Sequence, residues 1–233
     1  MKPLLVLAAF PVVLMGWASC SHSGTGHAAL PDPRAVDKSV PEYKNPFHPS
    51  TYAHFVARKD YRKTYDVYKD DTLLNRQPKK SRKIFVCLDE QRGQYLVDGL
   101  VAMNFPLSSG VKAYPTKTGD YAVISKKEDH TSNLYGKMYD AEGKCINYNA
   151  ESTDPIPEGG RFDGSPMPYW QRLTNAGLGL HVGKVRRHPV SHGCVRLPRN
   201  VAEILYRQTS IGTPVTIRKT PLPVPEAQKV PAV

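Results

Sequence analysis

The apolar positions in the middle of the chain recur with a period of two. Residues 84–88 alternate between two faces, as in a strand that buries one of them. Asp98 and Gly99 separate two further apolar runs, residues 94–97 and 100–103. An Asp-Gly pair between such runs is a strong hairpin signal, because both residues tolerate the positive φ of a tight turn.

Other parts of the pattern predict a few more short elements. Residues 119–124 and 215–217 predict short strands, and Asn200 is placed to cap a short helix with Glu203 three residues later. Residues 127–165 are polar and glycine-rich, and they predict long loops of the kind that often form lids or binding loops. The pattern alone therefore predicts a mainly β domain with one or two short helices.

The first 19 residues have the features of a secretory signal peptide. A basic start is followed by an apolar run over residues 4–15, and small residues precede Cys20. The run is too short for a spanning helix, which needs about 20 apolar residues. The ending resembles a lipobox, so we expect a lipid anchor on Cys20 that holds the protein to a membrane. Simple cleavage is the alternative, because Trp17 stands where leucine is usual.

Composition divides the remaining chain into further segments. Residues 20–50 are rich in Ser, Gly, His and Pro and predict a flexible tether. Residues 51–83 mix aromatic and charged side chains, and they predict a charged N-terminal extension at the domain edge, which we favour over a separate binding module. Residues 84–219 form the predicted domain, and the proline-rich residues 220–233 predict a disordered tail.

Charge and cysteine content narrow the possible partners. The 233-residue chain has a formal net charge of +11, which suits an anionic neighbourhood. The sequence has neither zinc-finger spacing nor an RRM-type aromatic block, so we expect no nucleic-acid partner and no metal. Cys87 and Cys145 could pair in an oxidising compartment, but connectivity cannot be deduced from spacing. Our default for Cys87 is a small buried apolar residue.

The candidate chemistry lies between Leu180 and Pro198, in the sequence LHVGKVRRHPVSHGCVRLP. Cys194 is preceded by two histidines, His192 and His181. A free thiol has a pKa of about 8.5, and it becomes a nucleophile only as the thiolate, which a nearby imidazole can produce. Gly193 permits a tight turn, so the amides around Cys194 can point at a tetrahedral oxyanion.

The ordered motifs around this segment resemble those of the L,D-transpeptidases, bacterial cell-wall enzymes with a YkuD-type catalytic domain. The signature is His-x-Gly, a short variable stretch, and then Ser-His-Gly-Cys-Val-Arg-Leu, here residues 181–197. Further similar stretches are the hairpin and Ser-x-Gly turn at 84–110, the Tyr-Pro-Thr stretch at 114–121, the approaches at 168–170 and 177–181, and the closing strand at 212–217. The resemblance covers roughly residues 82–219. It departs from the family pattern at Lys117 and in the short loop before Cys194.

This resemblance implies a β-sandwich and acyl transfer between peptidoglycan stem peptides. The Cys194 thiolate would attack the carbonyl that joins the L-centre of a diamino acid to D-alanine. D-Alanine would leave, and a thioester would remain on Cys194. An amine of a second stem peptide would then resolve the thioester into a cross-link. No metal or nucleotide cofactor is implied.

The resemblance also assigns roles around the thiol. His181 would be the general base and acid, oriented by the carbonyl of Val182. His192 is a rival base, but it lies so close along the turn that we prefer a structural or substrate-orienting role. His188 is a weaker rival, because a loop histidine is usually just solvated.

Four more side chains are candidate substrate contacts. Arg196 would share a strand face with Cys194, where it could hold a substrate carboxylate or favour the thiolate; a surface ion pair is the alternative. Ser191 fits a turn better than a nucleophile. Tyr169 and Trp170 would wall the cleft or pack in the core.

Three functions follow from these observations. The first is a periplasmic, membrane-anchored L,D-transpeptidase. In the second, the same thioester is resolved by a lysine of a wall-linked lipoprotein or by water, which gives an anchoring enzyme or a hydrolase. The third is a non-catalytic wall-binding lipoprotein, which has no need of a thiol beside a Ser-His-Gly turn.

Overall fold

The computed structural model describes residues 32–77, 81–221 and 224–229. The predicted signal peptide and Cys20 lie outside these residues. The helices are α1 (Tyr52–Ala57), α2 (Asp71–Leu74), α3 (Arg199–Gln208) and the 3-10 turn η1 (Glu226–Gln228). The strands are β1 (Tyr68–Lys69), β2 (Arg82–Cys87), β3 (Arg92–Val97), β4 (Leu100–Pro106), β5 (Gly119–Ala122), β6 (Ser125–Lys127), β7 (Thr131–Tyr139), β8 (Cys145–Glu151), β9 (Arg161–Pro166), β10 (Trp170–Arg172), β11 (Gly179–Val182), β12 (Val195–Leu197) and β13 (Pro214–Arg218).

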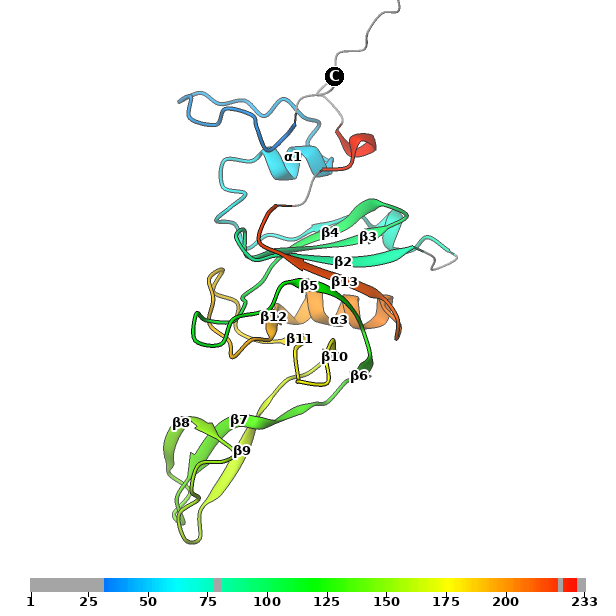
Figure 1. Ribbon diagram of the computed structural model, residues 1–233. Coiled ribbons are helices and arrows are strands. Elements are labelled where there is room, and N and C mark those ends of the chain that lie inside the picture. Colours follow the sequence, from blue (N-terminus) through cyan, green and yellow to red (C-terminus); the bar gives the residue numbers. More distant parts are fainter. Residues whose placement is uncertain (1–31, 78–80, 222–223, 230–233) are drawn as a thin grey trace, which may run out of the picture.

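The largest sheet has six strands in the order β1-β4-β3-β2-β13-β5. Its β3–β4 hairpin turns at Asp98 and Gly99, whose φ angles are 50° and 78°, so the predicted turn is confirmed. β13 pairs in parallel with β2, with Val215 opposite Ile84. The last strand of the domain therefore lies beside the first, as Figure 1 shows.

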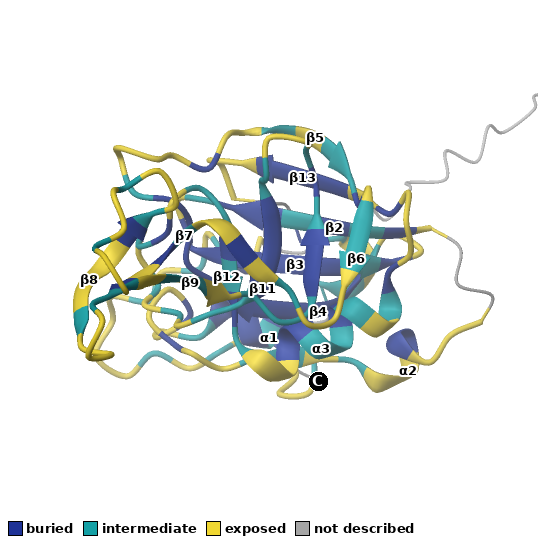
Figure 2. Ribbon diagram, turned by 90° about the horizontal axis from the view of Figure 1, so that it is seen from below, coloured by how far each residue is buried: buried dark blue, intermediate teal, exposed yellow. Residues whose placement is uncertain are grey.

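A second sheet, β12-β11-β10-β6, packs with α3 against one face of the first. The core between them holds apolar side chains from both sheets and the helix, among them Ile84, Tyr95, Phe105, Leu180, Leu197, Leu205 and Ile217. The most buried segments are the central strands of the large sheet (Figure 2). The predicted mainly β sandwich is confirmed.

Residues 127–165 form strands rather than the predicted long loops. β8, β7 and β9 make a three-stranded sheet that projects from the sandwich (Figure 1). Register shifts along β7 break the alternation that marks a strand in sequence. Gly136 has a packing reason, since a Cβ there would lie 2.1 Å from the Asp163 carbonyl oxygen.

The predicted cap of the C-terminal helix is wrong. α3 begins one residue before Asn200, and Pro198 is its N-cap residue without a side-chain hydrogen bond. The Asn200 side chain instead accepts from the Val201 amide at 3.0 Å. The predicted apolar face is present, because Val201 and Leu205 are buried.

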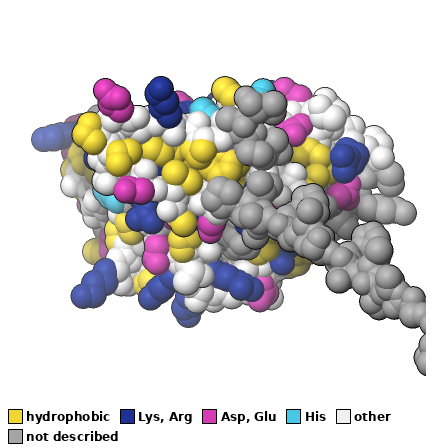
Figure 3. Space-filling view, turned by 90° about the horizontal axis from the view of Figure 1, so that it is seen from above, with side chains coloured by type: hydrophobic (Ala, Val, Ile, Leu, Met, Phe, Trp, Pro, Cys, Tyr) yellow, Lys and Arg dark blue, Asp and Glu magenta, His cyan; other side chains and the backbone are white. Residues whose placement is uncertain are grey.

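Residues that precede and follow the sandwich in the sequence pack together onto the outer face of the six-stranded sheet. Phe47 is 1% exposed, which differs from the flexible tether predicted for 20–50. Val224 is buried in the same layer, and the Gln228 side chain hydrogen-bonds both backbone groups of Val101, which differs from the disordered tail predicted for 220–233. Figure 3 shows this side of the molecule, with apolar side chains among Lys and Arg.

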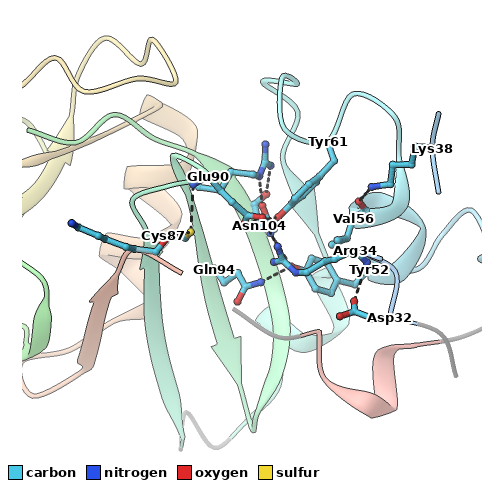
Figure 4. Close-up of polar contacts among 12 residues, drawn as sticks. Asp32, Arg34, Lys38, Tyr52, Val56, Tyr61, Cys87, Glu90, Gln94 and Asn104 are labelled. Carbon is cyan, nitrogen blue, oxygen red and sulfur yellow. Dashed lines mark hydrogen bonds and ion pairs between the residues drawn. The ribbon is translucent and has the colours of Figure 1, made fainter. Parts of the chain in front are cut away.

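A polar cluster lies beneath this layer (Figure 4). Arg34 forms an ion pair with Glu90, and both side chains are largely buried. The Cys87 thiol donates to the Lys219 carbonyl at 3.3 Å. Cys87 and Cys145 are both free thiols, so they do not pair, and Cys87 is buried as expected. Within the described ranges, no helix is long and apolar enough to cross a membrane.

Candidate active site

His181 and Cys194 lie on the same face of the second sheet. β11 and β12 pair in parallel, with Leu180 opposite Val195 and His181 opposite Arg196. Leu180 and Val195 are buried in the core. Because side chains alternate along strands, His181 and Arg196 lie on the other face, and Cys194, two residues before Arg196, shares it. Pairing thus places the thiol and the imidazole on one face of the sheet, with Arg196 directly opposite His181.

The next strand continues this face toward Trp170 and Arg172. β10 runs antiparallel to β11, with Arg172 opposite Gly179. The Trp170 ring centroid lies 5.9 Å from that of His181. A Cβ at Gly179 would be 2.4 Å from Trp170 Cη2, so only glycine leaves room for the indole over β11. Trp170 is 3% exposed and packs beside His181, so it is buried, as the core-packing alternative stated.

The backbone and burial fix the state of His181. Nδ1 lies 2.8 Å from the Val182 carbonyl oxygen, as the resemblance implied. A carbonyl only accepts, so Nδ1 carries the hydrogen and Nε2 keeps the free lone pair. Burial lowers the pKa of His181 to about 4, and the Arg196 and His130 charges act in the same direction. The imidazole is therefore neutral at neutral pH.

Cys194 is held as a thiol in this structure. Sγ donates to the Gly177 carbonyl at 3.3 Å. Burial raises the pKa of the Cys194 thiol, while the Gly179 amide, Arg196 and Arg172 oppose that shift. The described contacts contain no hydrogen bond between Sγ and His181. The site thus holds a neutral thiol near a neutral imidazole, rather than an ion pair.

Hydrogen bonds shape the turn that leads into Cys194. The Ser191 hydroxyl donates to the Cys194 carbonyl and accepts from the Gly193 amide at 3.2 Å. Ser191 is 2% exposed and is a turn residue, not the substrate contact we also predicted. Gly193 has a φ of 109°, which favours glycine. Because the Gly193 amide is engaged, it is not a free oxyanion donor. The amides of His192 and Cys194 have no acceptor among the described residues, which leaves them available.

The Ser-x-Gly turn after β4 packs against the turn that leads into Cys194 and hydrogen-bonds to it. The Ser109 carbonyl accepts from the Val190 and Ser191 amides at 2.8 and 3.1 Å. A Cβ on Gly110 would lie 2.8 Å from Gly193 Cα, so the two backbones touch. The Thr116 hydroxyl donates to the Gly193 carbonyl at 2.6 Å. Motifs far apart in sequence thus meet at the candidate nucleophile.

An aromatic cluster that sequence reasoning missed packs around the His192 ring. The His192 ring stacks on Tyr135 of β7, with centroids 4.3 Å apart and an interplanar angle of 17°, and lies 4.8 Å from the Tyr114 ring. Burial raises the pKa of Tyr135, and the charges of Glu151, Tyr114 and Cys194 add to the shift. His192 packs in this cluster, consistent with the preferred structural role. The only sequence signal was the length of the 127–165 segment.

The remaining predicted residues divide into two groups. Arg196 is half-buried, and its guanidinium has no partner among the described residues, so the predicted surface ion pair is absent from this part of the chain. Tyr169 does not join the site: it precedes β10 with a φ of 55°, its ring lies 5.6 Å from Tyr206 of α3, and it packs on the core. His188 is exposed, and its Nδ1 lies 3.2 Å from the Pro189 carbonyl oxygen.

A thiol and a neutral imidazole on one face of a β-sandwich sheet define a candidate cysteine-dependent enzyme. The family model for the L,D-transpeptidase catalytic domain, YkuD, matches residues 81–217. The chain therefore belongs to the YkuD L,D-transpeptidase family. Within the described ranges, no group of three His, Cys, Asp or Glu side chains could hold a metal ion.

The individual relatives share limited sequence identity with this chain. Probable L,D-transpeptidase 3 of Mycobacterium tuberculosis is 31% identical over 121 residues, which cover 49% of this chain and 38% of that protein. The match therefore spans well under half of that relative. An L,D-transpeptidase structure from Mycobacterium smegmatis is 22% identical, with 59% of this chain and 58% of that chain covered and a TM-score of 0.45. One from Stackebrandtia nassauensis is 22% identical, with 71% and 65% covered and a TM-score of 0.44.

Proposed function

We propose that this protein is an L,D-transpeptidase that cross-links peptidoglycan stem peptides through a thioester on Cys194. The observation that supports the proposal is that His181 and Cys194 share one face of the second sheet, with Nε2 of His181 unprotonated. Membership of the family supports the same reaction class.

In the first half-reaction, Cys194 attacks the carbonyl carbon between the diamino acid L-centre and D-alanine. Sγ leaves the Gly177 carbonyl and passes its proton to Nε2 of His181 as the S–C bond forms. The His192 and Cys194 amides stabilise the oxyanion. The protonated imidazole then gives its proton to the departing D-alanine amine, and the acyl group stays on sulfur.

In the second half-reaction, an amine of another stem peptide attacks the thioester carbonyl. His181 accepts the amine proton and returns one to the leaving thiolate, which restores the starting site. The free guanidinium of Arg196, on the face of Cys194, is suited to hold a carboxylate of either peptide. No cofactor takes part in these steps.

Two alternatives share the first half-reaction. A lysine of a wall-linked lipoprotein, or water, resolves the same thioester and makes the protein an anchoring enzyme or a hydrolase. The buried, lone-pair-bearing imidazole beside the thiol disfavours the third alternative, a non-catalytic wall binder. We further propose that Cys20 carries a lipid and that the protein acts in the periplasm as a membrane-anchored lipoprotein.

Acylation by a carbapenem, followed by intact-protein mass, tests the enzyme assignment. We expect one adduct on the wild type, none on Cys194→Ala, and acylation roughly 100-fold slower or worse on His181→Ala. His192→Ala should keep measurable acylation. A His181→Ala protein with wild-type acylation would overturn the mechanism. Mass spectrometry of muropeptides after incubation with the enzyme then identifies the acceptor, since cross-links, lipoprotein adducts and shortened stems differ in mass.

A further inference from the structure

The loop between His181 and Cys194 is tied to a part of the chain outside the matched catalytic domain. Arg187 lies in this loop, and its guanidinium reaches a turn in the N-terminal extension. Nη1 donates to the Thr64 carbonyl at 2.5 Å and is 3.5 Å from the Tyr61 carbonyl oxygen. Nη2 donates to the Glu90 carbonyl at 2.8 Å, in the turn between β2 and β3.

The acceptors of Arg187 are themselves held firmly. The Thr64 carbonyl also accepts from Arg92, at 3.0 Å, and Arg92 is 1% exposed at the start of β3. The Glu90 side chain forms the buried ion pair with Arg34. Arg187 thus binds the Thr64 and Glu90 carbonyls, where the extension is already fixed to the sheet, near the cluster in Figure 4.

The loop has few other anchors. Among the described residues of 184–190, only Arg187 uses its side chain to hydrogen-bond outside that segment. Its φ is 57°, a conformation that a non-glycine residue adopts only when its surroundings hold it there. Backbone hydrogen bonds flank Arg187 in the loop: the Arg186 amide donates to the Ser108 hydroxyl at 2.8 Å, and the Val190 amide donates to the Ser109 carbonyl.

We propose that Arg187 is a positioning residue, through which the N-terminal extension holds the loop that places Cys194 relative to His181. The proposal rests on the proposed acyl transfer, and it extends the functional unit beyond residues 81–217 to the turn at 60–64. Arg187 acts through geometry. The charges that influence the thiol belong to Arg196 and Arg172, so loss of the Arg187 charge leaves the thiol electrostatics unchanged.

The test compares carbapenem acylation rates of the full chain in three variants. Arg187→Gln removes the hydrogen bonds to the Thr64 and Glu90 carbonyls, and Arg187→Lys restores part of them. Arg186→Gln is the matched control, because Arg186 is exposed in the same loop. Rates are measured per folded molecule, well below the melting temperature. We expect Arg187→Gln to acylate roughly tenfold more slowly, since small misplacement of reacting groups is costly. Arg187→Lys should be intermediate, and Arg186→Gln should match the wild type.

The pH profile separates positioning from other roles. With Arg187→Gln, the maximal rate should fall while the pH midpoint of acylation stays in place. An arginine that only stabilises the fold would lower the melting temperature and leave the rate per folded molecule unchanged, which would overturn the proposal. If Arg187→Gln does not fold, Arg187→Lys decides in the same way: a wild-type rate overturns the proposal and a reduced rate supports it. A wild type without acylation would instead overturn the proposed function and this inference with it.

Discussion

The Thr116 hydroxyl donates a 2.6 Å hydrogen bond to the carbonyl of Gly193, the residue before the candidate nucleophile. Thr116 is 5% exposed, and its oxygen also accepts from the Gly110 amide at 2.8 Å. One side chain therefore ties the Ser-x-Gly turn to the turn that orients Cys194. The amides offered to an oxyanion follow from the same arrangement.

Replacing this hydroxyl should affect acylation more than folding. Thr116→Val keeps the shape and removes both hydrogen bonds of the hydroxyl, each about 0.5–1.5 kcal/mol. If that energy serves to orient the turn, acylation slows by up to roughly tenfold. Thr116→Ser, which keeps the hydroxyl, is the control and should stay near the wild-type rate. Equal rates for the Val and Ser variants would show that the turn holds its shape without Thr116.

The burial of His181 predicts an unusual acidic limb of the pH profile. The base must be unprotonated to accept the thiol proton. An ordinary histidine with a pKa of about 6.5 loses this capacity as the pH falls through 6.5. Burial lowers the pKa of His181 to about 4, so the imidazole remains unprotonated at pH 5.5. The rate of carbapenem acylation, measured as the initial rate of adduct formation, should stay nearly constant between pH 7 and 5.5. A half-maximum near pH 6.5 would contradict the buried, neutral base.

Local signals in the sequence were sufficient for much of the sandwich. The alternation at 84–88 and the Asp-Gly pair at 98–99 report on neighbours in the chain, and the structure has both elements there. The Val182 carbonyl beside His181 came from the family resemblance. It has no signature of its own, because a backbone acceptor is present at every residue.

Features that depend on distant pairing could not be predicted. Tyr135 reaches the site because β7 folds back with β8 and β9, and its register shifts hide the strand pattern. Arg187 looks like one more basic loop residue until Thr64 is seen beside it. Tyr169 and Trp170 are adjacent in sequence and read alike, yet the Tyr169 ring packs beside Tyr206 of α3 and the Trp170 ring packs beside His181.

Arg196 should control the reactivity of the thiol. Burial is the main reason that the pKa of Cys194 is raised, and the Arg196 cation works against it. Arg196→Gln removes that opposition, so the pKa of Cys194 should rise further. Iodoacetamide alkylation of Cys194, followed by peptide mass spectrometry across pH, should then shift to higher pH. Cys145, a partly exposed free thiol in the same protein, is the internal reference and should not shift. Parallel shifts of both thiols would point to a global change rather than to the Arg196 charge.

Arg92 should be a larger determinant of stability than its charge suggests. It is 1% exposed, and it donates to the Asn104 side chain at 2.5 Å, to the Thr64 carbonyl at 3.0 Å and to the Asp66 carbonyl at 2.8 Å. Arg92→Leu leaves these acceptors buried without donors, at roughly 1–3 kcal/mol for each unsatisfied group. Urea unfolding should therefore show a loss of about 2–4 kcal/mol, with partial relaxation of the site reducing the full sum. Arg76→Leu is the control, since its ion pair with Asp98 is exposed and should contribute about 0–1 kcal/mol. Equal losses in the two variants would mean that the extension docks on the sheet through its apolar contacts alone, with Arg92 adding nothing.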